Sequence, residues 1–116
     1  METVFKTRPV QPEKTNAILA IMSDAYSRNI LEVTQKSEKS AVKIAEETHI
    51  PISTVYRRLQ QLDDCNLVKI TGEITDEGKK NFLFRSKVRS IYAKFDQGFT
   101  TIEVVPNSPL IPTEMS

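Results

Sequence analysis

Apolar residues recur at helical spacing through the first half of the chain and alternate through the second half. Residues 13–22 predict a first short helix after Pro12, a residue that suits the start of a helix. Its apolar residues, at spacings that fit one helix face, are Ala17, Ile18, Ile21 and Met22. Ser23 is a suitable N-cap for a second helix that carries Tyr26, Ile30 and Val33 on one side.

The polar segment 35–39 ends the second helix, and Ser40 is positioned to cap a third helix that ends near Thr48. Pro51 disfavours a helical conformation at the residue before it, so the third helix cannot continue through this point. The pattern therefore predicts two short helices joined by a tight turn.

A fourth helix is predicted from a cap at Ser53 to about Asp64, with a buried stripe at spacings of four and three. The stripe consists of Val55, Leu59 and Leu62. Asn66 is expected to close this helix in the left-handed conformation, with Leu67 folded back onto the core.

Alternation begins at Val68 and predicts two hairpins. The first places Val68, Ile70 and Ile74 on the same side as Phe82 and Phe84, around a turn at 76–79. The second carries Ile91, Ala93 and Phe95 before a turn at 96–98 and continues through 99–105. The apolar phase shifts between the hairpins, so we expect a bend, bulge or short helical turn within 85–89.

A length of 116 residues fits one domain with tails. We expect a flexible arm over 1–11, a folded domain over 12–105 and a disordered tail over 106–116. Four helices followed by hairpins predict an α+β fold of the winged helix-turn-helix class, with a wing hairpin and an additional C-terminal β-hairpin.

Composition narrows the functional classes. No apolar run approaches the roughly 20 residues of a membrane helix, and the first residues do not resemble a secretory signal, so we expect a cytoplasmic protein without a membrane partner. The single cysteine, Cys65, excludes an internal disulfide, and we expect neither a metal site nor a cofactor. The sequence shows no catalytic arrangement and no phosphate-binding glycine loop, so an enzyme is not expected.

The net charge of +1 conceals an uneven distribution. Residues 51–95 carry nine basic and five acidic side chains, whereas residues 96–116 carry no basic and three acidic side chains. Attraction to phosphate is local because salt screens charges beyond about 8–10 Å. A nearly neutral protein can therefore bind nucleic acid through one basic face.

The fourth helix has the residue types of a recognition helix. Opposite its apolar stripe lie Ser53, Arg57 and Gln60, side chains that can hydrogen-bond to bases and phosphates in a major groove. We expect this surface, together with two lysines of the wing, to bind double-stranded DNA. The complete set is Ser40, Ser53, Thr54, Tyr56, Arg57, Arg58, Gln60, Gln61, Lys79 and Lys80.

The segment from Ser40 to Leu62, continuing through Asn66-Leu67-Val68, resembles the core of ArsR-like archaeal winged-helix regulators. The stretch Ser53-Thr-Val-Tyr-Arg-Arg-Leu59 is its most specific part, and the resemblance extends over about residues 17–105. It implies sequence-specific binding of a dimer to promoter DNA. The cysteine-rich motif of the family's metal sensors is missing, so the resemblance does not extend to metal sensing and leaves any small-molecule effector unknown.

Other interpretations fit parts of the pattern. A winged helix can serve as a protein–protein interaction module without direct DNA binding, and RNA is a third possible partner. Arg57 and Arg58 also fit a solvated helix face, and Lys79 and Lys80 fit strand positions that block edge pairing. His49 fits a structural or solvent-facing role, and Cys65 fits either a buried thiol or a redox-sensing thiol.

Assembly as a two-fold dimer is expected because a winged-helix core needs only the second to fourth helices and the first hairpin. The first helix and the last hairpin then keep apolar surface that a monomer exposes. The expected dimerisation residues are Ala17, Ile18, Ile21, Met22, Ile91, Ala93 and Phe95. Alternatively, the last hairpin folds back and buries these residues within one chain.

Overall fold

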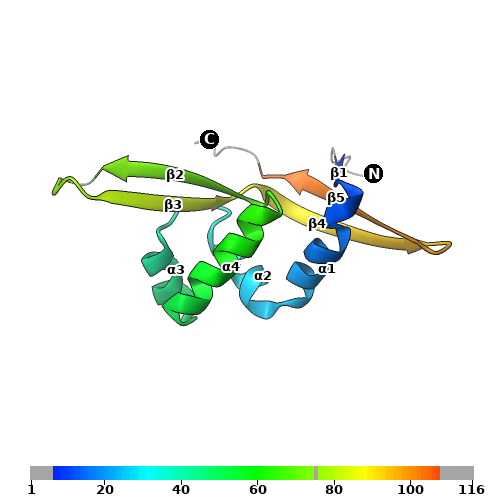
Figure 1. The fold of residues 1–116 in the computed structure, drawn as a ribbon, viewed down its shortest axis with the longest axis horizontal. Coiled ribbons are helices and arrows are strands. Elements are labelled where there is room, and N and C mark those ends of the chain that lie inside the picture. The colour runs from blue at the N-terminus through cyan, green and yellow to red at the C-terminus, as the bar shows by residue number, and fades with distance from the viewer. Residues whose placement is uncertain (1–6, 75, 108–116) are drawn as a thin grey trace, which may run out of the picture.

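Four α-helices pack as one group against two long hairpins that point in opposite directions (Figure 1). The computed structural model describes residues 7–74 and 76–107. A single 3-10 turn at Pro12–Lys14 leads into the first helix. The helices are α1 (Thr15–Ser23), α2 (Ala25–Val33), α3 (Ala41–Thr48) and α4 (Ile52–Asp64).

The strands form two antiparallel sheets. They are β1 (Arg8–Pro9), β2 (Val68–Ile74), β3 (Lys80–Ser86), β4 (Val88–Asp96) and β5 (Phe99–Pro106). Strands β2 and β3 form the wing hairpin, and the second sheet has the order β1-β5-β4. The β4–β5 turn places Gln97 and Gly98 at φ 52° and 86°, a left-handed pair that matches the twist of a two-residue hairpin turn.

The core lies where the helices meet the inner ends of both hairpins. Its fully buried aliphatic side chains come from every helix and from two strands: Ile18, Ile30, Ile44, Val55, Leu62, Val68 and Ile102. Burial of each large aliphatic side chain contributes about 1.5–3 kcal/mol. Because β2 and β5 both contribute to this core, the two hairpins are anchored to the same helices.

Local signals in the sequence placed several boundaries correctly. The Ser40 hydroxyl caps α3 by accepting a hydrogen bond from the Lys43 amide at 3.1 Å. Asn66 adopts φ 61°, and the buried Leu67 donates its amide to the Leu62 carbonyl at 2.9 Å, as expected for a left-handed helix end. The irregularity predicted within 85–89 is a register shift between Val88 and Ser90, at the start of β4.

Two predicted caps were wrong. Ser23 is the last residue of α1, and Asp24 caps α2 by accepting the Ser27 amide at 2.9 Å. An aspartate carboxylate caps a helix as well as a serine hydroxyl does. Residue type alone therefore could not distinguish Asp24 from Ser23, and the path of the backbone decides which of the two is the cap. Ser53 lies inside α4, which begins at Ile52 after Pro51 without a side-chain cap.

The expected flexible arm is partly docked. Arg8 and Pro9 pair with Val104 and Glu103 of β5, and the Val10 amide donates to the Ile102 carbonyl at 3.0 Å. A strand of two residues that contains proline has no alternation, so the sequence pattern did not reveal it. Of the expected disordered tail, Pro106 ends β5, and residues 108–116 lie outside the described residues.

The first helix is not an exposed apolar surface. Ile18 and Ile21 are 0% and 5% exposed, packed in the core of a single chain. Met22 and Ile91 are half-buried and pack against the same core. The expectation that a monomer exposes Ile18 and Ile21 was therefore wrong, because α1 packs against β5 of its own chain.

An ion pair ties the start of α2 to α4. Arg58 Nε lies 2.8 Å from Asp24 Oδ2, and the Arg58 guanidinium lies 5.9 Å from the centre of the Tyr26 ring. The same Asp24 oxygen accepts the hydroxyl of the buried Ser27 at 2.7 Å. The Ser27 hydroxyl, followed by the Arg58 guanidinium, holds the pKa of Asp24 below its ordinary value of 3.8, and partial burial opposes them.

The Asp24→Asn substitution is expected to keep the cap and lose the ion pair, lowering the free energy of unfolding at pH 7 by about 1 kcal/mol. Because the pKa of Asp24 is lowered by folding, its contribution is full above pH 3.8 and is lost as the pH falls through the folded pKa. Urea denaturation from pH 7 to pH 2 measures this difference. The exposed-site control Asp96→Asn is expected to change stability by less than about 0.5 kcal/mol. A wild-type advantage over Asp24→Asn that persists undiminished at pH 2 contradicts the assignment.

Candidate nucleic-acid interface

Helix α4 crosses the helical group with one side buried and the other open (Figure 1). Val55, Leu59 and Leu62 are at most 2% exposed and form the predicted inner stripe. Because this stripe packs against α2 and α3, the orientation of every other side chain on α4 is determined. The open side is thus a direct consequence of core packing.

The open side of α4 carries Ser53, Tyr56, Arg57 and Gln60, all exposed. Their spacing of three, four and seven residues places them on one face. Tyr56 is 55% exposed, and Gln60 donates its amide to Asp64 Oδ1 at 3.0 Å. The acidic residues of α4, Asp63 and Asp64, are confined to its last turn, so the face from Ser53 to Gln60 presents hydrogen-bonding groups and one cationic side chain. The structure thus brings together four of the expected contact residues.

Three other expected contact residues lie elsewhere on α4. Arg58 is engaged by Asp24, with a side chain only 20% exposed, and it does not share the open face with Arg57. Gln61 lines a cavity of about 520 Å³ between α1 and α4, together with Arg58. Thr54 is half-buried. Adjacent side chains on a helix point about 100° apart, so Arg57 and Arg58 lie on different sides of α4.

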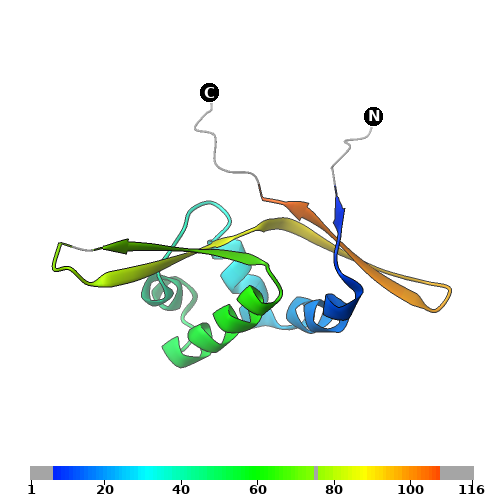
Figure 2. The same cartoon turned by 45° about the horizontal axis from the view of Figure 1, so that its top comes forward.

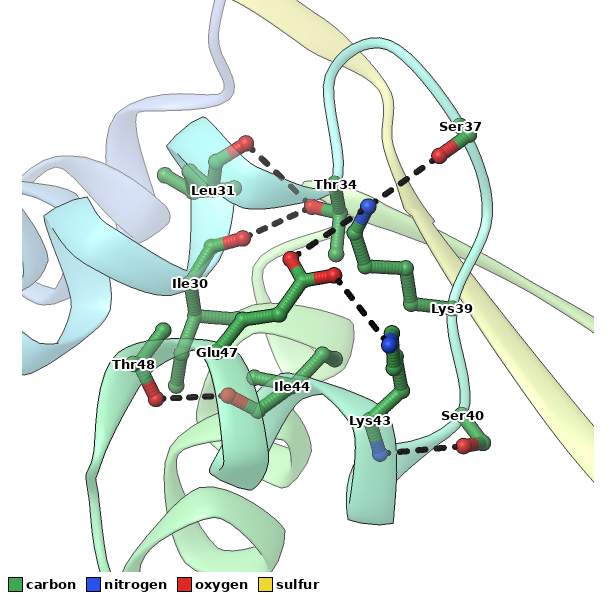
Figure 3. A network of polar contacts seen from close by, with 10 residues as sticks. All are labelled: Ile30, Leu31, Thr34, Ser37, Lys39, Ser40, Lys43, Ile44, Glu47 and Thr48. Carbon is green, nitrogen blue, oxygen red and sulfur yellow. Dashed lines mark hydrogen bonds and ion pairs between the residues drawn. The ribbon is translucent and has the colours of Figure 1, made fainter.

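Ser40 has a local structural role. Its hydroxyl oxygen caps α3, next to a polar network that holds the loop between α2 and α3 (Figure 3). In this network Lys39 Nζ lies 3.5 Å from Glu47 Oε1 and donates to Ser37 Oγ at 3.2 Å. Lys39 also exchanges both backbone hydrogen bonds with Phe84 of β3, so the loop joins the wing to α3.

The wing lysines lie near its outer end. Lys79 is exposed and immediately precedes β3. Lys80 pairs with Ile74 across the hairpin, and its Nζ lies 5.1 Å from the centre of the Phe82 ring. The five apolar residues predicted to share one face of the wing do share it, namely Val68, Ile70, Ile74, Phe82 and Phe84, but only Val68 and Phe84 at its base are buried.

The remaining reactive residues have ordinary surroundings. Cys65 is buried at the end of α4, and desolvation raises the pKa of its thiol. His49 is exposed and ends α3 in the left-handed conformation, at φ 61°. Within residues 7–74 and 76–107 no three His, Cys, Asp or Glu side chains are grouped to hold a metal ion, and none of the helices is both long and apolar enough to cross a membrane.

Sequence reasoning missed the roles of Asp24 and Lys39. Asp24 is separated from its ion-pair partner by 34 residues, and no local pattern marks such a pairing. A Ser-Asp pair at a helix start does indicate two competing caps, and that signal was available. The exchange of backbone hydrogen bonds between Lys39 and Phe84 has no side-chain signature at all.

Comparison with known proteins supports the fold. No protein-family model and no curated protein matches the chain. Among solved structures, the crystal structure of NolR from Sinorhizobium fredii superposes with a TM-score of 0.52 at 19% sequence identity, over 71% of this chain and 83% of that one. The four helices, the wing hairpin and this likeness confirm the expected fold class, an α+β winged helix-turn-helix.

Proposed function

We propose that this chain is a sequence-specific double-stranded DNA-binding protein that regulates transcription. The observation that carries the proposal is the open face of α4, where Ser53, Tyr56, Arg57 and Gln60 lie together and the first acidic side chain of the face, Asp64, stands only at its C-terminal end, hydrogen-bonded to Gln60. In a winged helix-turn-helix the corresponding helix fits the major groove, and these residue types hydrogen-bond to base edges and phosphates. The resemblance of residues 40–68 to ArsR-like archaeal regulators supports the same function.

The proposed contacts differ in kind. Arg57 reaches a base or a phosphate, and Ser53 near the uncapped start of α4 adds a hydroxyl beside backbone amides that carry partial positive charge. Lys79 and Lys80 of the wing contact phosphates. Thr54, Gln61 and Ser40 flank this surface as secondary contacts. Arg58 is excluded from the contact set because it is held by Asp24.

The protein acts as a homodimer in this proposal, joined through the β4–β5 hairpin, which projects beyond α1 (Figure 1). On one face of this hairpin the buried Ile102 continues outward to its partner Ala93 and then to Phe95, which is 76% exposed. Large exposed apolar side chains that continue a core usually mark an interface. Among the four α1 residues expected at the interface, Ala17 is the one that is fully exposed, and the proposed contact includes it.

We expect Arg57→Ala to weaken binding to a duplex selected from a random pool by about 5- to 150-fold, the effect of losing a base or phosphate contact of about 1–3 kcal/mol. Fluorescence anisotropy measures the dissociation constant. Lys94→Ala removes the same charge at an exposed position on the other hairpin, and its affinity is expected to match that of the wild-type protein. Equal affinity of Arg57→Ala and the wild-type protein refutes the assignment, and a wild-type chain that binds protein partners but no duplex favours an interaction module.

Light scattering is expected to give twice the chain mass of 13.2 kDa for the wild-type protein and a single chain mass for Phe95→Glu. A charge at the centre of an apolar interface is left desolvated and unpaired, which opposes association. Thr101→Glu introduces the same charge on the opposite face of the hairpin and is expected to leave the dimer intact. If the wild-type protein has the mass of one chain both without DNA and in its presence, this dimer is excluded.

A further inference from the structure

The wing hairpin exposes an unusual apolar face. Side chains on one face alternate along β2 and β3, and the pairs Ile70–Phe84, Gly72–Phe82 and Ile74–Lys80 all belong to it. Exposure rises outward from 9% at Phe84 through 49% at Phe82 to 70% at Ile74. The face therefore begins in the core and ends as an open apolar surface, which we call the wing face: Ile70, Gly72, Ile74, Lys80 and Phe82.

The one charged residue of the wing face is Lys80, and its side chain lies along the apolar surface. Lys80 Nζ lies 5.1 Å from the centre of the Phe82 ring. A Cβ added at Gly72 would stand 3.0 Å from Lys80 Cε, so the absence of a side chain at Gly72 makes room for the lysine stem. No acidic residue occupies a strand position on this face, whereas Asp76 and Glu77 lie in the turn beyond it. The strand positions of the wing face thus present a phosphate with one cation and no carboxylate, and the turn beyond them carries Lys79 beside Asp76 and Glu77.

The wing face and α4 lie on the same side of the hairpin. Val68 and Phe84, at the base of the same face, are buried against the helices, so the outer residues point to the side occupied by α3 and α4 (Figures 1 and 2). A duplex held by the open face of α4 thus lies on the side to which Ile74 and Phe82 project.

We propose that the wing face enters the minor groove beside the major groove read by α4, where Ile74 and Phe82 act as an apolar wedge that bends the duplex. This inference rests on the proposed function. Proteins that bind the minor groove use such side chains to open base steps and kink DNA, and flanking cations neutralise the phosphates. Ile74 and Phe82 open one step, and Lys80 pairs with a phosphate at the groove edge. Charge complementarity selects DNA as the occupant, since Lys80 is the only charged residue among the strand positions of the face.

The test measures the bend directly. The probe is a duplex selected from a random pool for binding to the wild-type protein, labelled at both ends for energy transfer. Ile74→Thr and Phe82→Thr keep residue types that suit strands while removing the apolar contact. Each substitution is expected to abolish most of the bend. Each is also expected to weaken binding by about tenfold, because it removes about 60 Å² of apolar contact. Lys80→Met is expected to reduce the salt dependence of binding by about one ion.

Leu83→Thr is the matched control, because Leu83 lies on the opposite face of the same strand and pairs with Thr71. It is expected to leave the bend unchanged, and circular dichroism verifies that each variant is folded. If the wild-type protein binds and Arg57→Ala weakens it, while Ile74→Thr and Phe82→Thr bind and bend as wild type, the wedge is refuted and the DNA-binding function stands. If Ile74→Thr and Phe82→Thr change only the oligomeric mass of the protein without DNA, the wing face contacts another protein chain and the inference fails. If the wild-type protein binds no duplex, the proposed function fails as well.

Discussion

The structure depends on the burial of one stripe of α4. Val55, Leu59 and Leu62 are almost completely enclosed, and the helices that enclose them also hold the inner ends of both hairpins. Because a helix has a fixed angular repeat, burying this stripe turns Arg57 outward and Arg58 toward Asp24. Core packing thus separates two adjacent arginines into a candidate DNA contact and a structural ion pair.

Core packing also positions the two hairpins, which form the two ends of the molecule. Each begins in the common core, at Val68 and Phe84 or at Ile102, and each ends with exposed apolar side chains. They differ in charge and position. The wing face carries Lys80 and lies on the side of α4, which suits DNA, whereas the β4–β5 hairpin extends to the opposite end, past α1, which suits a second copy of the chain (Figure 1).

The predictable features were those encoded by neighbouring residues. The helices, the left-handed Asn66 and the hairpin faces follow from spacing and from single-residue preferences, and the sequence located them. The short strand Arg8–Pro9, the Asp24–Arg58 pair and the burial of Ile18 and Ile21 depend on contacts between distant segments. Alternation placed Ile74 and Phe82 on the correct face, but it could not show that the helices end before they cover these residues.

The most direct test of the central claim is selection of bound duplexes from a random pool by the wild-type protein, followed by sequencing. We expect an enriched motif of two inverted half-sites whose centres are about one helical turn, 10–10.5 base pairs, or a multiple of it apart. The half-sites reflect two copies of α4, and the spacing reflects the dimer. A bound fraction with no motif beyond the starting pool contradicts sequence-specific recognition by α4.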